Sequence, residues 1–176
     1  MTLLVTAYLG LGSNLDDPAA QVARAIDALA ALSGSSLRAV SSFYRNPPMG
    51  PQDQPDYVNA VVALDTSLTP RALLEAMQAI ERSQGRDRSG QRWGPRTIDL
   101  DLLVYGDMLI AEDHLTVPHA GLAERAFVLV PLAEIAPQLS IPGQPALTTL
   151  LAAVDCASVV PMAAPSRSLP RISSTR

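Results

Sequence analysis

Two carboxylates interrupt a hydrophobic run near the middle of the chain. Asp99 and Asp101 stand two positions apart in a segment, 98–104, whose other residues are all Ile, Leu or Val. Alternate side chains of a strand project from the same face, so the two Cα atoms would lie about 7 Å apart. Carboxylates at that spacing can share or bridge a hard cation such as Mg²⁺. A D-x-D pair alone is weak evidence, because it is also typical of solvated or arginine-paired aspartates.

A concentration of arginine precedes the aspartates. All 13 basic residues of the chain are arginine, and the stretch 82–96 contains a single acid, Asp87. The arginines of this stretch are Arg82, Arg86, Arg88, Arg92 and Arg96. Magnesium sites for nucleotides leave positions for phosphate oxygens, and guanidinium groups pair well with phosphate. We therefore expect the aspartates to hold metal and the arginines to hold a polyphosphate, with Arg82 interpreted as a surface charge.

The loop between these arginines has the composition of a lid. It runs from Gly85 to Pro95 and contains Trp93, the only tryptophan. This side chain is expected either to pack against a flat ligand or anchor a lid, or else to be buried in the core. The earlier turn GLGSN, at 10–14, lacks the third glycine of a nucleotide-binding loop, and we interpret it as the approach to a helix cap.

The composition is that of a folded protein without a general affinity for polyanions. The chain has 176 residues, 48% of them hydrophobic, and a net charge of −4, which favours one domain and gives no reason to expect nucleic acid as a partner. The single cysteine, Cys156, fits a reducing compartment. The apolar run 3–11 has no basic flank, and no segment reaches the roughly 18 apolar residues of a membrane span. We expect a soluble, cytoplasmic monomer with no membrane partner.

Hydrophobic periodicity predicts the order βαββαβ. Strands are expected at 3–11, 37–45, 57–65 and 97–105, where apolar residues are continuous or alternate with polar ones. Asp17 with Pro18, and Thr69 with Pro70, are typical helix starts, and Gly34 would close the first helix. Two helices on one face of a four-stranded, mainly antiparallel sheet form a ferredoxin-like α+β sandwich.

The signals weaken beyond Gly106. A hairpin through Leu115 to Val117 and short helices near Leu122 and Leu147 are expected there. From Ala157 onward the chain is rich in proline, serine and arginine without periodicity. We therefore predict a single catalytic domain at 1–156 and a disordered tail at 157–176.

Strict alternation also assigns the faces of the sheet. The residues predicted to face the two helices are Ile98, Leu100, Leu102 and Val104. Those predicted to lie on the opposite face are Asp99, Asp101, Leu103 and Tyr105. In the strand 57–65, Tyr57 and Asn59 fall on the face of the aspartates, so polar groups are expected to gather on the side away from the helices.

Several separated segments agree in order and spacing with one enzyme family. "RWGPRTIDLDLL" closely resembles the signature of the 6-hydroxymethyl-7,8-dihydropterin pyrophosphokinases of folate biosynthesis. The likeness extends to "GLGSN", "SSFYRNPPMGPQDQPDYVNAVVALDTSL", "ERSQGR", "LTVPH" and "PLAEIAP". The resemblance implies transfer of a pyrophosphoryl group from ATP to the pterin hydroxymethyl group, release of AMP, and two Mg²⁺ ions as cofactors.

The same resemblance implies roles for individual residues. Asp99 and Asp101 would be the Mg²⁺ ligands, and Arg86 and Arg96 would serve the chemical step. The residues that would border the ATP are Gln78, Glu81, Arg88, Trp93, Thr116, His119 and Arg125. Those that would hold the pterin are Asn46, Pro47, Pro48, Met49, Tyr57, Asn59 and Phe127, with recognition at 46–49 through the backbone.

Three positions depart from the family pattern. Asn46 stands where related enzymes often have threonine, Ala120 where an aromatic residue is common, and His114 where some relatives have a basic residue. The first is compatible with recognition through the backbone. The other two bear on the nucleotide contact.

Two other functions remain open from the residues alone. A two-metal nucleotidyl transferase or cyclase can also display paired aspartates on a βαββαβ sheet, but it attacks the α-phosphorus and releases pyrophosphate. A ferredoxin-like RNA-binding module could use the arginines to contact phosphates. Against that module, the chain has only two phenylalanines for a stacking platform, and the aspartates would repel RNA.

Overall fold

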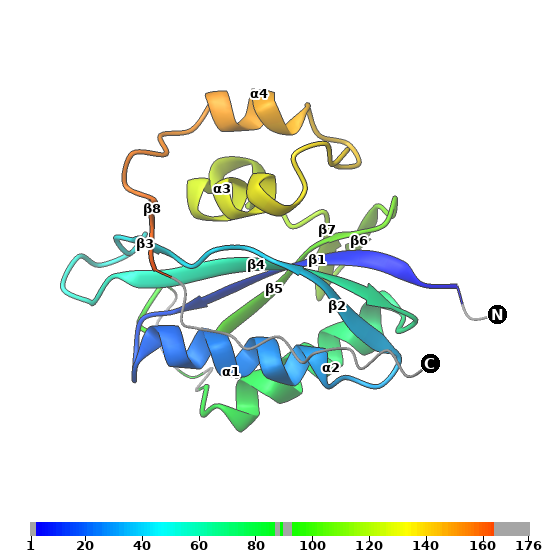
Figure 1. Ribbon diagram of the computed structural model, residues 1–176, viewed down its shortest axis with the longest axis horizontal. Helices are drawn as coiled ribbons and strands as arrows, with labels where there is room; N and C mark the ends of the chain where they lie inside the picture. Colours follow the sequence, from blue (N-terminus) through cyan, green and yellow to red (C-terminus); the bar gives the residue numbers. More distant parts are fainter. Residues whose placement is uncertain (1–2, 87–88, 90–92, 164–176) are drawn as a thin grey trace, which may run out of the picture.

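A computed structural model describes residues 3–86, 89 and 93–163 (Figure 1). Its first elements are β1 (Val5–Ser13), α1 (Pro18–Ala30), β2 (Ser35–Val40), β3 (Tyr44–Asn46), β4 (Tyr57–Thr66), α2 (Pro70–Ser83) and β5 (Asp99–Tyr105). They are followed by β6 (Ile110–Glu112), β7 (Leu115–Val117), the 3₁₀ helix η1 (Leu122–Glu124), α3 (Ala126–Ile135), α4 (Leu147–Ala152) and β8 (Val160–Pro161). Within these ranges no helix is long and apolar enough to cross a membrane.

The main sheet has the predicted ferredoxin-like order. β1 lies between β5 and β4, and β2 and β3 both pair with β4, all antiparallel. The predicted single strand 37–45 is in fact two strands, because the chain leaves the ladder between β2 and β3. Between them, Ser41 satisfies the backbone groups of Val61: its N–H donates to the Val61 carbonyl and its Oγ accepts from the Val61 N–H, each at 2.9 Å.

The two predicted helix starts are confirmed. The Asp17 carboxylate accepts a hydrogen bond from the Ala20 N–H, and the Thr69 hydroxyl accepts one from the Ala72 N–H. Each capping residue is followed by a proline at the first helical position, where the missing N–H leaves no bond unmade. α1 and α2 pack their apolar sides on one face of the sheet, and the buried side chains there form the larger core.

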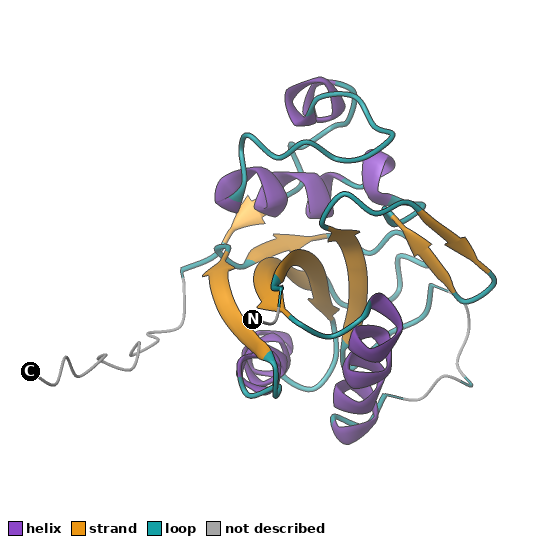
Figure 2. Cartoon of the chain, turned by 90° about the vertical axis from the view of Figure 1, so that its right-hand side faces the viewer, coloured by secondary structure: helices purple, strands orange, loops and turns teal. Residues whose placement is uncertain are grey.

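A third layer covers part of the opposite face, on which polar groups were expected to gather. α3 and α4 lie on that side of the sheet (Figures 1 and 2) and enclose a second core with Val61 and Leu103. Hydrophobic periodicity does not predict α3, because this helix is apolar on most sides, has no side-chain cap and contains Pro131. The sheet face that carries Asp99 and Asp101 is therefore left uncovered by this layer only beyond the first turn of α3.

A β-bulge corrects the predicted faces of β5. Tyr8 pairs with Val104 and Leu9 pairs with Leu102, so Leu103 is an extra residue in this ladder. Beyond it the alternation inverts: Val104 packs in the core under α3, and Tyr105 packs in the core under α1 and α2. Asp99 and Asp101 precede the bulge, so their predicted face is unchanged.

The segment predicted as a tail, 157–176, includes a short strand. Val160 and Pro161 form β8, which pairs with Tyr44 and Arg45 of β3, and the Met162 N–H donates to the Phe43 carbonyl at 2.7 Å. The chain after α4 thus returns to the edge of the main sheet. The rest of the predicted tail, 164–176, lies outside the described residues.

Glu134 of α3 joins the third layer to the edge of the sheet. Its carboxylate accepts hydrogen bonds from the Ser42 N–H, from the Ser42 hydroxyl at 2.7 Å and from the Tyr44 hydroxyl at 2.6 Å. Burial by itself would raise the pKa of Glu134, but the bonds from Tyr44 and Ser42 outweigh it and lower the pKa. The ionised form is therefore the one that holds α3.

We expect Glu134→Gln to lower the free energy of unfolding at neutral pH by about 1 kcal/mol. This is the usual contribution of a charge-assisted hydrogen bond, reduced because Glu134 is exposed to solvent. Because the folded-state pKa lies below the unfolded one, this contribution is present above the unfolded pKa and is lost as pH falls through the folded pKa. Urea titrations across acidic and neutral pH measure the difference. Glu75→Gln, on the exposed side of α2, is the control. A wild-type advantage that persists undiminished at the acid end would contradict the assignment.

Candidate active site

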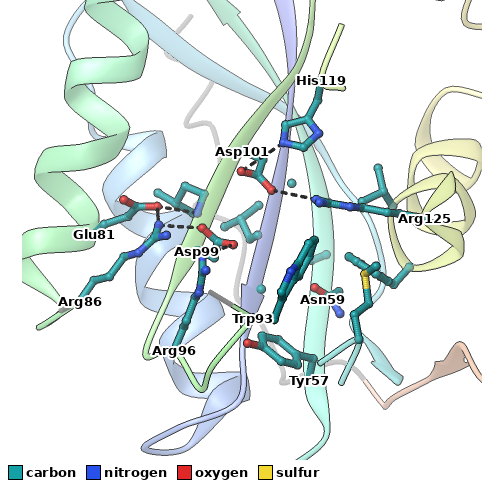
Figure 3. Close-up of a pocket in the computed structure, with 18 of the residues that line it drawn as sticks. Tyr57, Asn59, Glu81, Arg86, Trp93, Arg96, Asp99, Asp101, His119 and Arg125 are labelled. Atoms are coloured by element: carbon teal, nitrogen blue, oxygen red, sulfur yellow. Dashed lines mark hydrogen bonds and ion pairs between the residues drawn. The ribbon is translucent and has the colours of Figure 1, made fainter. Parts of the chain in front are cut away.

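A pocket of about 440 Å³ opens on the aspartate face of the sheet (Figure 3). Its walls come from β1, β4 and β5, from α2 beyond the β5 edge, and from the first turn of α3. The predicted residues on its wall are Asn46, Met49, Tyr57, Asn59, Gln78, Glu81, Arg86, Trp93, Arg96, Asp99, Asp101, His119, Arg125 and Phe127. The structure thus brings together residues that are up to 81 positions apart in the chain, from 46 to 127.

The other predicted residues lie elsewhere. Pro47, Pro48 and Thr116 do not line this pocket. The Pro47 carbonyl, however, accepts a hydrogen bond from Asn46, which does line it. Arg88 falls outside the described residues. His114, named above as a departure, does line the pocket, from the turn between β6 and β7.

The two aspartates differ in how they are paired. Asp99 accepts from the Arg86 Nη1 at 2.7 Å and from the Arg96 Nη1 at 3.2 Å. Among the described residues, Asp101 has longer contacts alone, 3.6 Å to His119 Nε2 and 3.8 Å to Arg125 Nη1. Asp99 is therefore already neutralised by arginine, whereas Asp101 carries a charge that its neighbours compensate poorly.

The electrostatics of Asp101 fit a cation site. Burial, followed by the charge of Asp99, raises the pKa of Asp101 to about 7. A divalent cation between the two carboxylates would remove this repulsion and favour the ionised form. In the described part of the chain no group of three or more His, Cys, Asp or Glu side chains is placed to hold a metal. Two carboxylates with water and ligand oxygens are, however, the donor set that Mg²⁺ typically uses.

Glu81 lines the pocket, and its carboxylate is bonded within the protein. It is 1% exposed, and its Oε1 accepts from the Leu100 N–H at 2.9 Å and forms an ion pair with Arg86. Leu100 lies between the two aspartates on β5, an edge strand whose backbone groups need partners. Glu81 therefore fixes both the aspartate strand and Arg86 to α2.

Arg96 is held through its backbone by a residue that the sequence analysis did not single out. The Arg96 N–H donates to Asn14 Oδ1 at 2.8 Å, and the Asn14 N–H donates to the Arg96 carbonyl at 3.1 Å. Asn14 ends the GLGSN turn and is 1% exposed. An asparagine of this kind, directly after a buried strand, is the signal that could have identified it.

His119 presents a proton donor to the pocket. Its Nδ1 accepts from the Gly121 N–H at 3.0 Å, which places the ring proton on Nε2, facing Asp101. Burial and the nearby Arg125 lower the pKa of His119. The neutral imidazole thus has no free lone pair toward the pocket, and it can donate a hydrogen bond there but cannot act as a base.

The other end of the pocket is suited to a flat ring. Tyr57 donates its hydroxyl hydrogen to the Gly94 carbonyl at 3.0 Å, which turns its ring along the pocket. Trp93 is 39% exposed, and Figure 3 shows its indole between Tyr57 and Arg125, whose guanidinium lies 5.6 Å from the ring centre. Trp93 therefore lines the pocket and is not buried in the core.

Two glycines of β1 were missed as pocket residues. Gly10 and Gly12 alternate on the strand, and both line the pocket floor. A Cβ on Gly12 would lie 2.6 Å from the Asn59 Oδ1, so any other residue at position 12 would displace the Asn59 side chain. Two glycines at strand period within an otherwise apolar run were the signal.

Fold and pocket together define a class of protein. The ferredoxin-like sheet carries paired carboxylates, arginines and a hydrogen-bond-donating histidine next to an aromatic slot. This combination is typical of an enzyme that transfers a phosphate-containing group. Residues 8–137 match the family model of 7,8-dihydro-6-hydroxymethylpterin-pyrophosphokinase. The chain belongs to this family, as its sequence resemblance predicted.

Individual relatives agree with the family match. A 2-amino-4-hydroxy-6-hydroxymethyldihydropteridine pyrophosphokinase of Haemophilus influenzae is 49% identical over 148 residues, which cover 84% of this chain and 92% of the relative. A Pseudomonas aeruginosa protein of the same name is 50% identical over 151 residues, covering 86% and 93%.

Solved structures support the fold. The wild-type Plasmodium falciparum HPPK-DHPS superimposes with a TM-score of 0.68 at 14% identity, over 85% of this chain and 44% of that longer one. The ferredoxin-like α+β architecture predicted from the sequence is thereby confirmed.

Proposed function

We propose that this protein transfers the pyrophosphoryl group of ATP to the hydroxymethyl group of 6-hydroxymethyl-7,8-dihydropterin, with AMP as the second product. The observation that carries the proposal is the continuity of one pocket: its carboxylate and arginine end suits a metal–polyphosphate, and its Tyr57 and Asn59 end suits a polar heterocycle. The names of the relatives describe this reaction, and they describe neither nucleotidyl transfer nor RNA binding.

Asp99 and Asp101 would hold two Mg²⁺ ions. When bound, these ions supply neutralisation of the polyphosphate charge. Because the contacts of Asp101 within the described part of the chain are the long ones to His119 and Arg125, its oxygens are the more available of the two.

The chain's own cations would stabilise the transferring group. The pterin hydroxyl oxygen forms a bond to the β-phosphorus, the bond from that phosphorus to the α,β-bridging oxygen breaks, the oxygen leaves on AMP, and the hydroxyl proton is released. Arg86 and Arg96, held in place by Asp99, would pair with phosphate oxygens and stabilise the negative charge that shifts among them. The His119 Nε2–H would donate a hydrogen bond to a phosphate oxygen, and Arg125 would pair with another.

The remaining assignments concern binding of the two substrates. Gln78, on the pocket wall, and Arg88 and Thr116 would border the nucleotide, together with Trp93. Tyr57 and Phe127 would flank the pterin ring, and Asn59 would bond its amide-like edge. Asn46 and Met49 would close that end, next to Pro47 and Pro48.

Radiolabel in the γ-phosphate of ATP tests the proposal. The pyrophosphokinase reaction carries the label into the pterin product and leaves unlabelled AMP. Nucleotidyl transfer or cyclisation would instead leave the label in free pyrophosphate. Chromatography of a reaction with reduced hydroxymethylpterin separates these products, and omission of the pterin is the control. Label in pyrophosphate with adenylate on the acceptor would overturn the assignment.

A further inference from the structure

Two buried asparagines meet at the pterin end of the pocket. Asn46 ends β3 and is 5% exposed, and Asn59 lies on the neighbouring β4 and is 6% exposed. The Asn59 Nδ2 donates to the Asn46 Oδ1 at 2.5 Å, and the Asn46 Nδ2 donates to the Pro47 carbonyl at 3.0 Å. Both residues line the pocket.

The direction of these bonds is determined from one end. A backbone carbonyl can only accept, so the amide nitrogen of Asn46 must face Pro47. The Asn46 oxygen then faces Asn59, and Asn59 must present its nitrogen to that oxygen. A reversed Asn59 amide would bring two carbonyl oxygens together and leave a buried donor without its partner, which is costly at this depth.

The Asn59 oxygen is consequently directed toward β1. It lies where a Cβ on Gly12 would come within 2.6 Å, and among the described residues no donor is bonded to it. One of the two Asn59 N–H groups also remains, because Asn46 takes only the other. The pocket thus presents an acceptor on the Gly12 side and a donor on the Asn46 side.

We infer that Asn46 is a positioning residue that sets the substrate specificity of the pocket, by locking the donor–acceptor order of Asn59. This inference rests on the proposed function. A 4-oxo pterin carries a ring N–H beside a carbonyl oxygen, which complements an acceptor beside a donor. A 4-amino pterin carries an unprotonated ring nitrogen beside an amino group, which is the reverse order. Discrimination between the two follows from the lock and not from Asn59 alone.

The test measures dissociation constants of 6-hydroxymethyl-7,8-dihydropterin and its 4-amino counterpart by calorimetry, with Mg²⁺ and a non-hydrolysable ATP analogue present. The wild type should prefer the 4-oxo ligand by at least about 100-fold, since buried polar groups reject a ligand that leaves them unpaired. Asn46→Leu keeps the shape but releases Asn59 to reverse, and the preference should fall below about 10-fold.

Asn46→Asp is the matched rescue variant. Ionised or protonated, this side chain keeps an oxygen that accepts from Asn59, so the order and the preference should persist even if both ligands bind more weakly. A thermal midpoint for each variant separates this readout from stability, because a merely structural role would weaken both ligands alike and leave their ratio unchanged.

Four outcomes overturn the inference. The first two are an undiminished preference in Asn46→Leu, and an equal loss of preference in Asn46→Asp. The third is a wild type that binds both ligands equally. A wild type that binds the nucleotide but neither pterin would overturn the proposed function and this inference with it.

Discussion

Asp101→Asn is expected to reduce kcat by at least about 1,000-fold, because a metal-binding carboxylate contributes several kcal/mol of charge stabilisation. The substitution keeps the size of the side chain and its long contacts to His119 and Arg125. Asp99→Asn should be comparably inactive, but it also removes an ionic partner that Arg86 and Arg96 share, so Asp101 is the cleaner probe.

The same substitution should stabilise the metal-free protein. The pKa of Asp101 is raised to about 7 by burial and by Asp99, so the folded state holds this proton more tightly than the unfolded state does. Wild-type stability therefore falls as pH rises from the unfolded pKa to the folded one, and stays lowered above it. At about pH 8 without metal, Asp101→Asn should unfold with a free energy higher by on the order of 1 kcal/mol, after allowance for the partly exposed carboxylate.

Magnesium should reverse the order of stabilities. Added Mg²⁺ binds the folded wild type and raises its thermal midpoint, whereas the variant should respond little. Asp107→Asn, at an exposed aspartate just beyond the same strand, is the control for both measurements. Near-normal turnover of Asp101→Asn at saturating Mg²⁺, or an equal Mg²⁺ response in both proteins, would refute the metal assignment.

Arg96→Ala is expected to cost roughly 3 kcal/mol of transition-state stabilisation, about a 100-fold to 1,000-fold loss in kcat. The guanidinium of Arg96 contacts Asp99, and its backbone is held by Asn14, so the charge is fixed before the reaction begins. A preorganised charge costs no rearrangement as the transferring group becomes more negative, which is why its loss should appear in kcat.

Steady-state kinetics with both substrates checks this prediction. Arg82→Ala, in which an exposed arginine of the preceding helix is removed, should behave as the wild type. Arg96→Lys should recover part of the loss, because it restores a charge but not the forked geometry of a guanidinium. A raised KM with unchanged kcat would instead make Arg96 a group that binds ground state and transition state equally.

Local patterns were sufficient for the frame of the fold. Asp17 and Thr69 mark helix starts because the capping oxygen and the following proline act within four residues. The period of two along β4 and the first half of β5 places Tyr57, Asn59, Asp99 and Asp101 on one face for the same reason. The family signature, also local, identified the class of chemistry.

Contacts between distant segments decided the rest. The bulge that reverses the faces of Val104 and Tyr105 depends on the pairing of β5 with β1. The helix α3 is stabilised by burial against the sheet and not by the hydrophobic periodicity of its own sequence. The bonds of the Glu81 carboxylate to the Leu100 N–H and to Arg86 were not predictable from local pattern, because they depend on how α2 packs beside β5. Asn14 and Asn46 act through partners 82 and 13 positions away.

The sequence by itself thus determined the residue types of the site and the elements that carry them, since propensity, capping and alternation act over a few residues. Only the tertiary structure decided which way each polar group points. A buried carboxylate or amide takes the orientation that satisfies its hydrogen bonds, and for Glu81, Asn46 and Asn59 the groups that satisfy them come from other elements of the fold.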